Sequence, residues 1–258
     1  MTREVNGRRA GALADSGPPK QTLASAIHAQ LRDAILTNSI PPDSKLNIRE
    51  LCARYSVGIS PVREALSRLS SEGLVDQSDN RGFSVMPVSV PELIDLTQAR
   101  CWINEVGLRQ SIAKGGPEWE ERVVVAFHRL SRTPRHTGGA VADRNPAWEQ
   151  AHRVFHRSLI DGCGSHWITD ICERLFESAE RYRHIAREAG VFRGNLEDEH
   201  RQIMQAAIDR KADEAVSLLN AHFLRTAEIV QRAVALGAFH AGSAEQKLAA
   251  GGLVGSRN

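Results

Sequence analysis

The sequence predicts a mainly α-helical protein in which a small N-terminal domain precedes a larger helical bundle. Apolar residues recur at helical spacing along most of the 258 residues. Short stretches rich in Gly, Pro and Asn separate these segments, as loops between helices do. Hydrophobic residues make up 41% of the chain, enough for a substantial core, whereas aromatic residues make up only 5%. This composition favours helices that pack through Leu, Ile, Val and Ala.

Changes in composition divide the chain into four parts. Residues 1–19 mix Gly, Pro, Arg and Asp without periodicity, so we expect a disordered N-terminal segment. Residues 20–88 are expected to form the N-terminal domain, and residues 89–236 the all-helical domain. Residues 237–258 are rich in Ala, Gly and Ser and are expected to be a flexible tail. No apolar run approaches membrane-spanning length and the start lacks a signal-peptide core, which predicts a soluble, cytoplasmic protein.

The N-terminal domain begins with two predicted helices. The first is expected over residues 22–37, where Leu and Ile recur at helical spacing. The second is expected over residues 47–55. Asn47 is a favourable capping residue there, and Glu50, three residues later, can complete a capping box.

A third helix is predicted from Ser60 to Gly73, directly after a Val-Gly-Ile break. Ser60 offers an N-cap oxygen, and Pro61 then occupies the first helical position, where its missing N–H is harmless. Gly73 is expected to end the helix. The buried stripe of this helix is expected to contain Val62, Ala65, Leu66 and Leu69.

Two short strands are expected next, in residues 74–77 and 83–86, around a Ser-Asp-Asn-Arg-Gly turn. Two helices, a tight turn and a hairpin indicate a winged helix-turn-helix with a small β-hairpin wing. Arg49 and Arg63 on its two helices suit DNA, because guanidinium groups pair with guanine edges or phosphates in the major groove. The wing tip, residues 80–82, is expected in the neighbouring minor groove. The alternative is a small helical subdomain whose arginines simply lie on the surface.

The all-helical domain contains six predicted helices and no convincing strand. A Ser-Val-Pro-Glu sequence at residues 89–92 supplies a capping box with proline in the first turn. Most connecting loops are short enough for antiparallel neighbours, so we expect an antiparallel bundle. The helices are predicted over residues 90–114, 118–132, 147–161, 166–189, 196–210 and 212–236.

Charge and cysteine content restrict how the protein can bind its partners. The net charge of +2 provides no basic tail that could supply affinity for nucleic acid. Binding to double-stranded DNA must therefore come from a local group of arginines, doubled by dimerisation. The four cysteines lie far apart without metal-ligand spacing, which is typical of buried thiols in a reducing compartment.

Four histidines of the bundle fall on apolar helix faces. His152 and His156 are four residues apart and so share one face of a helix, while His200 and His222 lie on the apolar sides of the last two helices. Burying several unpaired imidazoles is costly, whereas a divalent cation would satisfy them together. The alternative is that each histidine forms an ordinary hydrogen bond within the core.

Arg100 lies on the first bundle helix among apolar neighbours. A partly buried guanidinium needs an anion, and the carboxylate of a ligand could bind it bidentately. Arg100 is therefore a candidate effector-binding residue. The alternative is a salt bridge to Glu105, Glu177 or Glu180.

The whole pattern resembles the GntR family of bacterial transcription regulators, in the branch named for FadR, whose effector domain is called FCD. The resemblance covers about residues 22–236. It is carried by Pro-Asp-Ser-Lys-Leu at 42–46, Ser-Pro-Val-Arg-Glu-Ala-Leu at 60–66 with Gly73-Leu74, the Phe155-His156 pair, and His200 followed by His222. It implies a winged helix-turn-helix that binds DNA and an all-helical, FCD-like domain that binds an effector and dimerises.

The resemblance also implies site residues. The family's DNA contacts fall on Arg49, Gly58, Ile59, Ser60, Pro61, Arg63 and Gly82. Many relatives have an arginine where this chain has Ile59, so the operator sequence does not follow. The family's metal site, an Asp four residues before a His and then two further His, falls on His152, His156, His200 and His222.

Two departures from the family pattern lie in the effector domain. Imidazole replaces the carboxylate ligand at His152, which lowers the attraction for a cation such as Zn, Ni or Mn. The family arginine that meets the effector's carboxylate matches Arg100, but Asn104 stands where an acidic residue is usual. Segments near residues 163–183 look similar to the glutarate-responsive repressors of carbon-starvation genes, which hints at the class of ligand.

The sequence therefore predicts a dimeric, ligand-responsive repressor that binds a palindromic operator, and not an enzyme. Its DNA affinity would be modulated by a small carboxylate in the helical domain. One alternative is a metalloenzyme that uses a histidine-bound cation for hydrolysis. Against it, no catalytic base is visibly paired with the histidines and the winged helix would have no role. Another alternative is a constitutive DNA-binding protein with an inert bundle.

Overall fold

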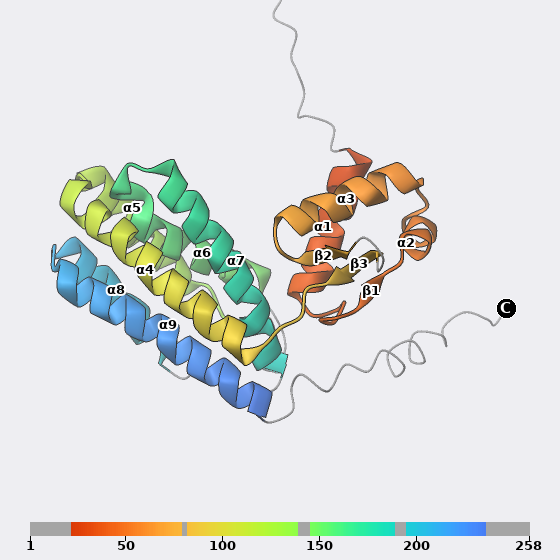
Figure 1. Cartoon of the computed structure of the whole chain (residues 1–258). Helices are drawn as coiled ribbons and strands as arrows, with labels where there is room; N and C mark the ends of the chain where they lie inside the picture. The colour runs from red at the N-terminus through yellow and green to blue at the C-terminus, as the bar shows by residue number, and fades with distance from the viewer. Residues whose placement is uncertain (1–21, 79–81, 139–144, 189–194, 236–258) are drawn as a thin grey trace, which may run out of the picture.

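The computed structural model describes residues 22–78, 82–138, 145–188 and 195–235. Figure 1 shows a small N-terminal domain beside an elongated bundle of long helices. The predictions for residues 1–19 and 237–258, and for the first two residues of the wing tip, lie outside the described residues.

The N-terminal domain consists of three helices and a small antiparallel sheet. Its elements are α1 (Leu23–Leu36), β1 (Lys45–Leu46), α2 (Ile48–Tyr55), α3 (Ile59–Ser71), β2 (Val75–Ser78) and β3 (Gly82–Val85). The predicted two-stranded hairpin is confirmed as β2 and β3. The sheet has a third strand that the sequence did not reveal, in the order β1-β3-β2, with Lys45 opposite Ser84 and Leu46 opposite Phe83. A strand of two residues is too short to show an alternating pattern.

The helix ends agree with the predicted capping at α2 but not at the start of α3. The Asn47 side chain accepts a hydrogen bond from the Arg49 backbone N–H at 2.9 Å. Glu50, however, accepts from the Asn47 side-chain amide at 3.1 Å. Helix α3 begins earlier than predicted, with Gly58 as its N-cap and no side-chain cap, so the Ser60 cap is wrong. Ser60 and Pro61 lie instead in the first turn, where backbone N–H groups have no helical partner.

The end of α3 agrees with the prediction. Gly73 follows this helix with φ +72°, a left-handed conformation that favours glycine because it has no Cβ. The backbone N–H of Leu74 then donates to the Leu69 carbonyl at 3.0 Å, which closes the last turn.

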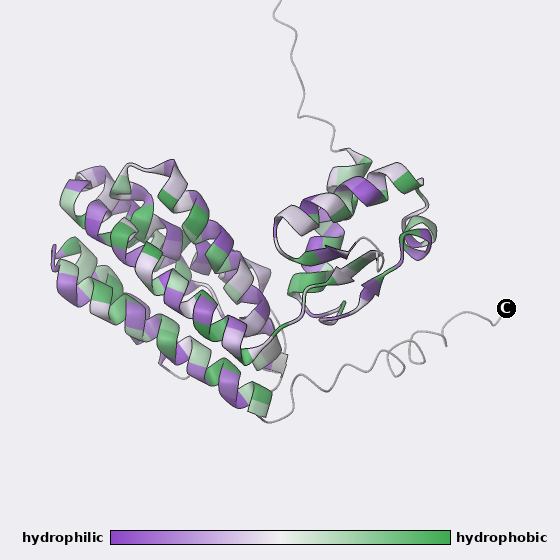
Figure 2. Ribbon diagram, in the orientation of Figure 1, coloured by the Kyte–Doolittle hydropathy of each residue, from purple (hydrophilic) through white to green (hydrophobic). Residues whose placement is uncertain are grey.

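All six predicted bundle helices are confirmed, and each described end lies within two residues of its expected position. They are α4 (Val90–Lys114), α5 (Pro117–Arg132), α6 (Pro146–Ile160), α7 (His166–Glu188), α8 (Leu196–Ile208) and α9 (Ala212–Ala235), with a short 3-10 turn, η1 (Asp161–Cys163), after α6. Helix α4 packs against both α7 and α9, while α5 packs against α6 and α8. Figure 2 shows hydrophilic and hydrophobic residues alternating along these helices, as expected for amphipathic rods.

Each domain has a hydrophobic core of its own. The expected stripe of α3, Val62, Ala65, Leu66 and Leu69, is completely buried against α1 and the sheet. In the bundle, Trp119 and Phe155 are among the largest buried side chains, and the Trp119 indole N–H donates to the Ser158 carbonyl at 2.9 Å.

Shortening Leu66 should destabilise the N-terminal domain, because this side chain is 0% exposed and its truncation leaves a cavity. We expect Leu66→Ala to lower the free energy of unfolding by about 2–5 kcal/mol. Urea unfolding followed by circular dichroism measures the decrease. The exposed neighbour Ser67 is the control, since Ser67→Ala should change stability by no more than about 0.5 kcal/mol. Equal stabilities of the two variants would contradict the assigned core.

Candidate ligand pocket and DNA-binding face

Four histidines from three helices meet inside the bundle. His152 and His156 come from α6, His200 from α8 and His222 from α9. One ring nitrogen of each lies within 4.8 Å of the others, and all four side chains are buried. The sequence-based expectation that separate helices direct these imidazoles into one place is therefore met.

The geometry of the four rings, called the histidine cluster below, fits a divalent cation. The Nε2 atoms of His152 and His156 are 3.1 Å apart. Nitrogen ligands of a tetrahedral zinc ion lie roughly 3.4 Å from one another. The four imidazoles, whose ring nitrogens lie within 4.8 Å of one another, would therefore move closer together to close on an ion. Burial, together with the neighbouring imidazoles, holds the pKa of His152 and of His156 well below the usual range. Both rings are therefore neutral at pH 7, which is the form that binds a metal.

Glu199 fixes the orientation of one of these rings. Its Oε2 lies 2.9 Å from Nδ1 of His222, and its Oε1 accepts from Arg225. When Nδ1 carries the proton for this contact, Nε2 of His222 is left with its lone pair directed inward. A carboxylate behind a histidine is the usual arrangement of metal sites, where it fixes the tautomer of the ring.

Arg100 is buried beside the cluster, with 4% of its surface exposed. Its guanidinium carbon lies 4.0 Å from the ring centre of Phe223. Its Nε has no hydrogen-bond partner among the described residues. Burial, and then the positive charge of Arg183, lowers the pKa of Arg100 to about 9.

The alternative of a salt bridge for Arg100 is not met by the described ion pairs. Each of the three candidate carboxylates pairs with another arginine. Glu105 pairs with Arg109 at 2.8 Å, and Glu177 pairs with Arg32 at 2.7 Å and with Arg153 at 2.6 Å. Glu180 accepts from the Nε of Arg183 at 2.8 Å.

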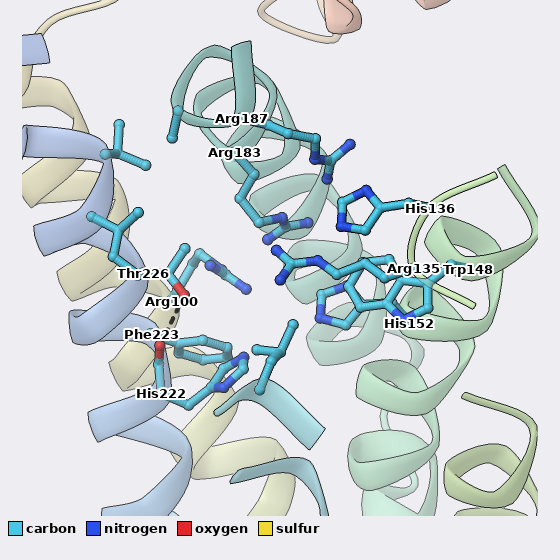
Figure 3. Close-up of a pocket in the computed structure, with 14 residues that line it drawn as sticks. Arg100, Arg135, His136, Trp148, His152, Arg183, Arg187, His222, Phe223 and Thr226 are labelled. Atoms are coloured by element: carbon cyan, nitrogen blue, oxygen red, sulfur yellow. Dashed lines mark hydrogen bonds between the residues drawn. The ribbon is translucent and has the colours of Figure 1, made fainter. Parts of the chain in front are cut away.

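A cavity of about 670 Å³, counted with its opening to solvent, lies next to Arg100 and the histidine cluster. Figure 3 shows Arg100, Arg135 and Arg183 turned toward this space from different walls, with His152 and His222 at its base. The described residues that line it include no Asp or Glu. They are Arg100, Arg135, His136, Trp148, His152, Arg183, Ala186, Arg187, Leu196, His222, Phe223, Thr226, Ile229 and Val230.

The nearby carboxylates lie behind this lining. Glu180 binds Arg183, and Glu149 binds Arg187 at 2.6 Å, so each holds its arginine in place from outside the cavity. A cavity with a positive wall, apolar patches and no acid among its described lining is suited to a small organic anion.

Several residues of the pocket were not identified from the sequence. Arg135 and His136 come from the segment between α5 and α6, which has no periodicity that would reveal where its side chains point. Arg187 lies one helical turn after Arg183 on α7, a spacing that suits a solvated face equally well. Glu199 had one usable signal, a charged residue directly beside the buried His200.

The residues proposed to contact DNA lie near the start of α2, at the start of α3 and at the start of β3. Arg49, Gly58, Ile59, Ser60, Arg63 and Gly82 are exposed, and Pro61 is half-buried. Arg49 and Gly82 line the same open hollow between the start of α2 and the wing. Arg68, also exposed, donates to the Ser25 hydroxyl at 3.1 Å and so contacts α1 instead.

Among the residues that the structure describes, no helix is long and apolar enough to cross a membrane.

Comparison with known proteins identifies both domains. Residues 23–85 match the model of bacterial regulatory proteins of the gntR family, and residues 95–225 match the FCD domain. The HTH-type transcriptional repressor GlaR of Escherichia coli (strain K12) is 34% identical over 80% of this chain and 94% of its own length. The HTH-type transcriptional regulator BphR of Paraburkholderia xenovorans (strain LB400) is 35% identical over 85% of this chain and 91% of its own.

Solved structures support the fold. A GntR transcriptional regulator from Rhodococcus sp. RHA1 aligns with a TM-score of 0.62 at 21% identity, covering 81% of this chain and 97% of its own. E. coli McbR/YncC aligns with a TM-score of 0.59 at 16% identity, covering 83% and 96%. The chain belongs to the GntR family of bacterial transcription regulators, with an FCD domain as its helical bundle.

Proposed function

We propose that this regulator is a dimeric repressor whose hold on a palindromic operator changes when a small carboxylate binds in the cavity of Figure 3. The observation that carries the proposal is the buried guanidinium of Arg100, which faces a cavity lined by imidazoles and arginines and by no described acid. The comparisons give no support to a metalloenzyme, because the relatives named above are transcription regulators. One of them is named as a repressor.

The carboxylate is assigned to Arg100 on electrostatic grounds. A charged guanidinium removed from water is costly unless an anion and hydrogen bonds compensate it. A carboxylate can accept two parallel hydrogen bonds from the planar guanidinium, which fixes its direction as well as its place. Arg183 on the neighbouring helix α7 adds a second positive charge to the lining, so a ligand with two carboxylates is favoured over one with a single carboxylate.

A divalent cation in the histidine cluster fits the same ligand. Imidazole donors suit Zn and Ni better than Mn, which prefers oxygen ligands. Neutral imidazole ligands would leave the charge of the cation uncompensated, and a bound carboxylate would supply the missing negative charge.

On DNA, α3 is proposed to enter the major groove with Arg63 at the base edges. Two copies would address half-sites related by two-fold symmetry. Ile59, 58% exposed at the start of α3, would offer an apolar contact such as that with a thymine methyl group.

Arg63→Ala should lower discrimination against mutated operators by about 1–3 kcal/mol for each base edge that the guanidinium no longer reads. Fluorescence anisotropy with an operator selected from random duplexes measures this change. Arg68→Ala is the matched control, because Arg68 is on the same helix but bonded to Ser25. A uniform decrease in affinity for every sequence, with a shallower salt dependence, would mark Arg63 as a phosphate-binding residue instead.

Arg100→Ala should abolish the response to carboxylates and leave operator binding intact. A thermal-shift panel of acetate, lactate, succinate and glutarate, each with and without chelator, measures binding to the wild-type protein and to the variant. Arg109→Ala removes a surface ion pair of the same helix and should respond like the wild type. An undiminished shift in Arg100→Ala would remove this residue from the site.

Glu199→Gln should weaken zinc binding about 10–100-fold, because the charged partner of His222 is removed. Competition against a chromophoric chelator measures the affinity. Glu197→Gln, which alters an exposed residue paired with Arg201, should leave the affinity unchanged. Equal affinities of both variants would show that Glu199 does not support the cluster.

A further inference from the structure

The N-terminal domain touches the bundle through an ion pair between α1 and α7. Nη2 of Arg32 lies 2.7 Å from Oε2 of Glu177, and each side chain is only 21% exposed. Figure 1 shows α7 on the side of the bundle that faces the N-terminal domain. Partial burial makes such a pair stronger, and more sensitive to its geometry, than a pair in open solvent.

Glu177 is shared with a second arginine, which belongs to the helix that carries two of the clustered histidines. Its Oε1 lies 2.6 Å from Nη2 of Arg153 on α6. Arg153 directly follows His152 and precedes His156 by three residues. Glu173, one turn before Glu177 on α7, also pairs with Arg153. A shift of α6 therefore moves Arg153 relative to the Glu177 carboxylate and alters the contact of that carboxylate with Arg32.

On the side of the N-terminal domain, Arg32 also contacts the end of α3, the helix proposed to enter the DNA major groove. Nε of Arg32 lies 3.1 Å from Oε2 of Glu72, and Oε1 of Glu72 lies 2.6 Å from Nε2 of His28. Glu72 is the residue at which α3 ends. Glu72, Arg32, Glu177 and Arg153 thus form a continuous row of charged side chains from α3 to α6, which we call the ion-pair relay.

The linker between the domains is held separately. Arg181 donates to the Met86 carbonyl, and the Tyr182 hydroxyl contacts the Ser89 carbonyl at 3.3 Å and also the Glu92 carboxylate. These contacts join α7 to the linker and to the start of α4 and do not involve α6. They hold the linker on α7 through groups other than those of the Arg32–Glu177 contact.

We infer that the ion-pair relay transmits occupancy of the pocket to the N-terminal domain. The inference rests on the proposed function, since it assigns a route by which the carboxylate site regulates DNA binding. A ligand or cation that draws His152 and His156 inward moves Arg153 with them. The Glu177 carboxylate, which contacts both Arg153 and Arg32, then changes position. Because Arg32 lies on α1 and also binds Glu72 at the end of α3, the orientation of α1 and α3 changes with it. Because Glu177 binds Arg153 through Oε1 and Arg32 through Oε2, a displacement of Arg153 acts on the same carboxylate that holds Arg32. Two placements of α6 therefore give two arrangements of the N-terminal domain, as a switch requires.

The ion-pair relay is tested by removing the charge of each partner of the Arg32–Glu177 pair in turn. Arg32→Gln removes the charge in the N-terminal domain, while Glu177→Gln removes it in the bundle and keeps the Arg32–Glu72 pair. The measured quantity is the ratio of operator dissociation constants with and without glutarate in zinc-loaded, full-length protein. Ligand couplings usually change affinity about 5–150-fold. We expect both variants to reduce the wild-type ratio to within about twofold of one, while glutarate still raises their melting temperature.

Arg109→Gln is the matched control, since it breaks an ion pair within the bundle and should keep the wild-type ratio. Small-angle X-ray scattering of the ligand-free proteins provides a readout that needs no ligand. Glu177→Gln should change the distance distribution, and Arg109→Gln should not.

The outcomes separate the two claims. A wild-type ratio of one with each of acetate, lactate, succinate and glutarate would overturn the proposed function, whatever the scattering shows. A normal wild-type response that persists in Arg32→Gln and Glu177→Gln would overturn the relay alone. Scattering curves for Glu177→Gln that match the wild type would also count against the relay, because the link would then not hold the domains in place.

Discussion

The structure depends on one electrostatic constraint, the burial of a guanidinium and four imidazoles inside a helical bundle whose cavity has no described acidic lining. Apolar side chains would fill this space at lower cost, because polar nitrogen atoms carry a desolvation penalty when they leave water. The protein therefore gives up stability at Arg100 and the histidine cluster. An anion or cation that compensates these groups and binds the folded state alone raises its stability, by an amount that grows with the logarithm of the ligand concentration relative to Kd. A site built at the expense of stability is well suited to sensing.

In the proposed function, the bundle would convert binding in the pocket into movement of whole helices. The four imidazoles come from α6, α8 and α9, and Arg100 comes from α4, so a ligand that contacts them fixes the relative positions of four rods. Packed helices move as units, and small displacements between them are therefore carried over their full length. Helix α6 carries both a pair of histidines and Arg153, which links the pocket to α7 and so to the N-terminal domain.

Features that depend on local periodicity were predictable from the sequence. Features that depend on which side chains pair in the folded structure were not. Residues at i and i+4 lie on the same face of a helix, and an apolar face packs inward. The inward direction of His152 and His156 was therefore predictable from their spacing. The absence of a described carboxylate partner for Arg100 was not predictable, because Glu105, Glu177 and Glu180 were all within plausible reach, and only the packing assigns them to other arginines. β1 is too short to show a pattern. Gly58 is the N-cap of α3 instead of the expected Ser60, since glycine is also a favourable N-cap residue.

The position of the Glu199 carboxylate affects which ligand the histidine cluster can bind. Glu199 touches His222 from behind and shares its charge with Arg225, so it orients a ring without neutralising the space in front of it. An acid inside the cavity would pair with Arg100 and with any cation, and would leave an incoming carboxylate nothing to compensate. With imidazole at His152 and the acid placed outside, the largest gain in free energy goes to a ligand that brings its own negative charge. In the proposed function, an organic anion rather than a protein side chain would therefore complete the charge balance of the site.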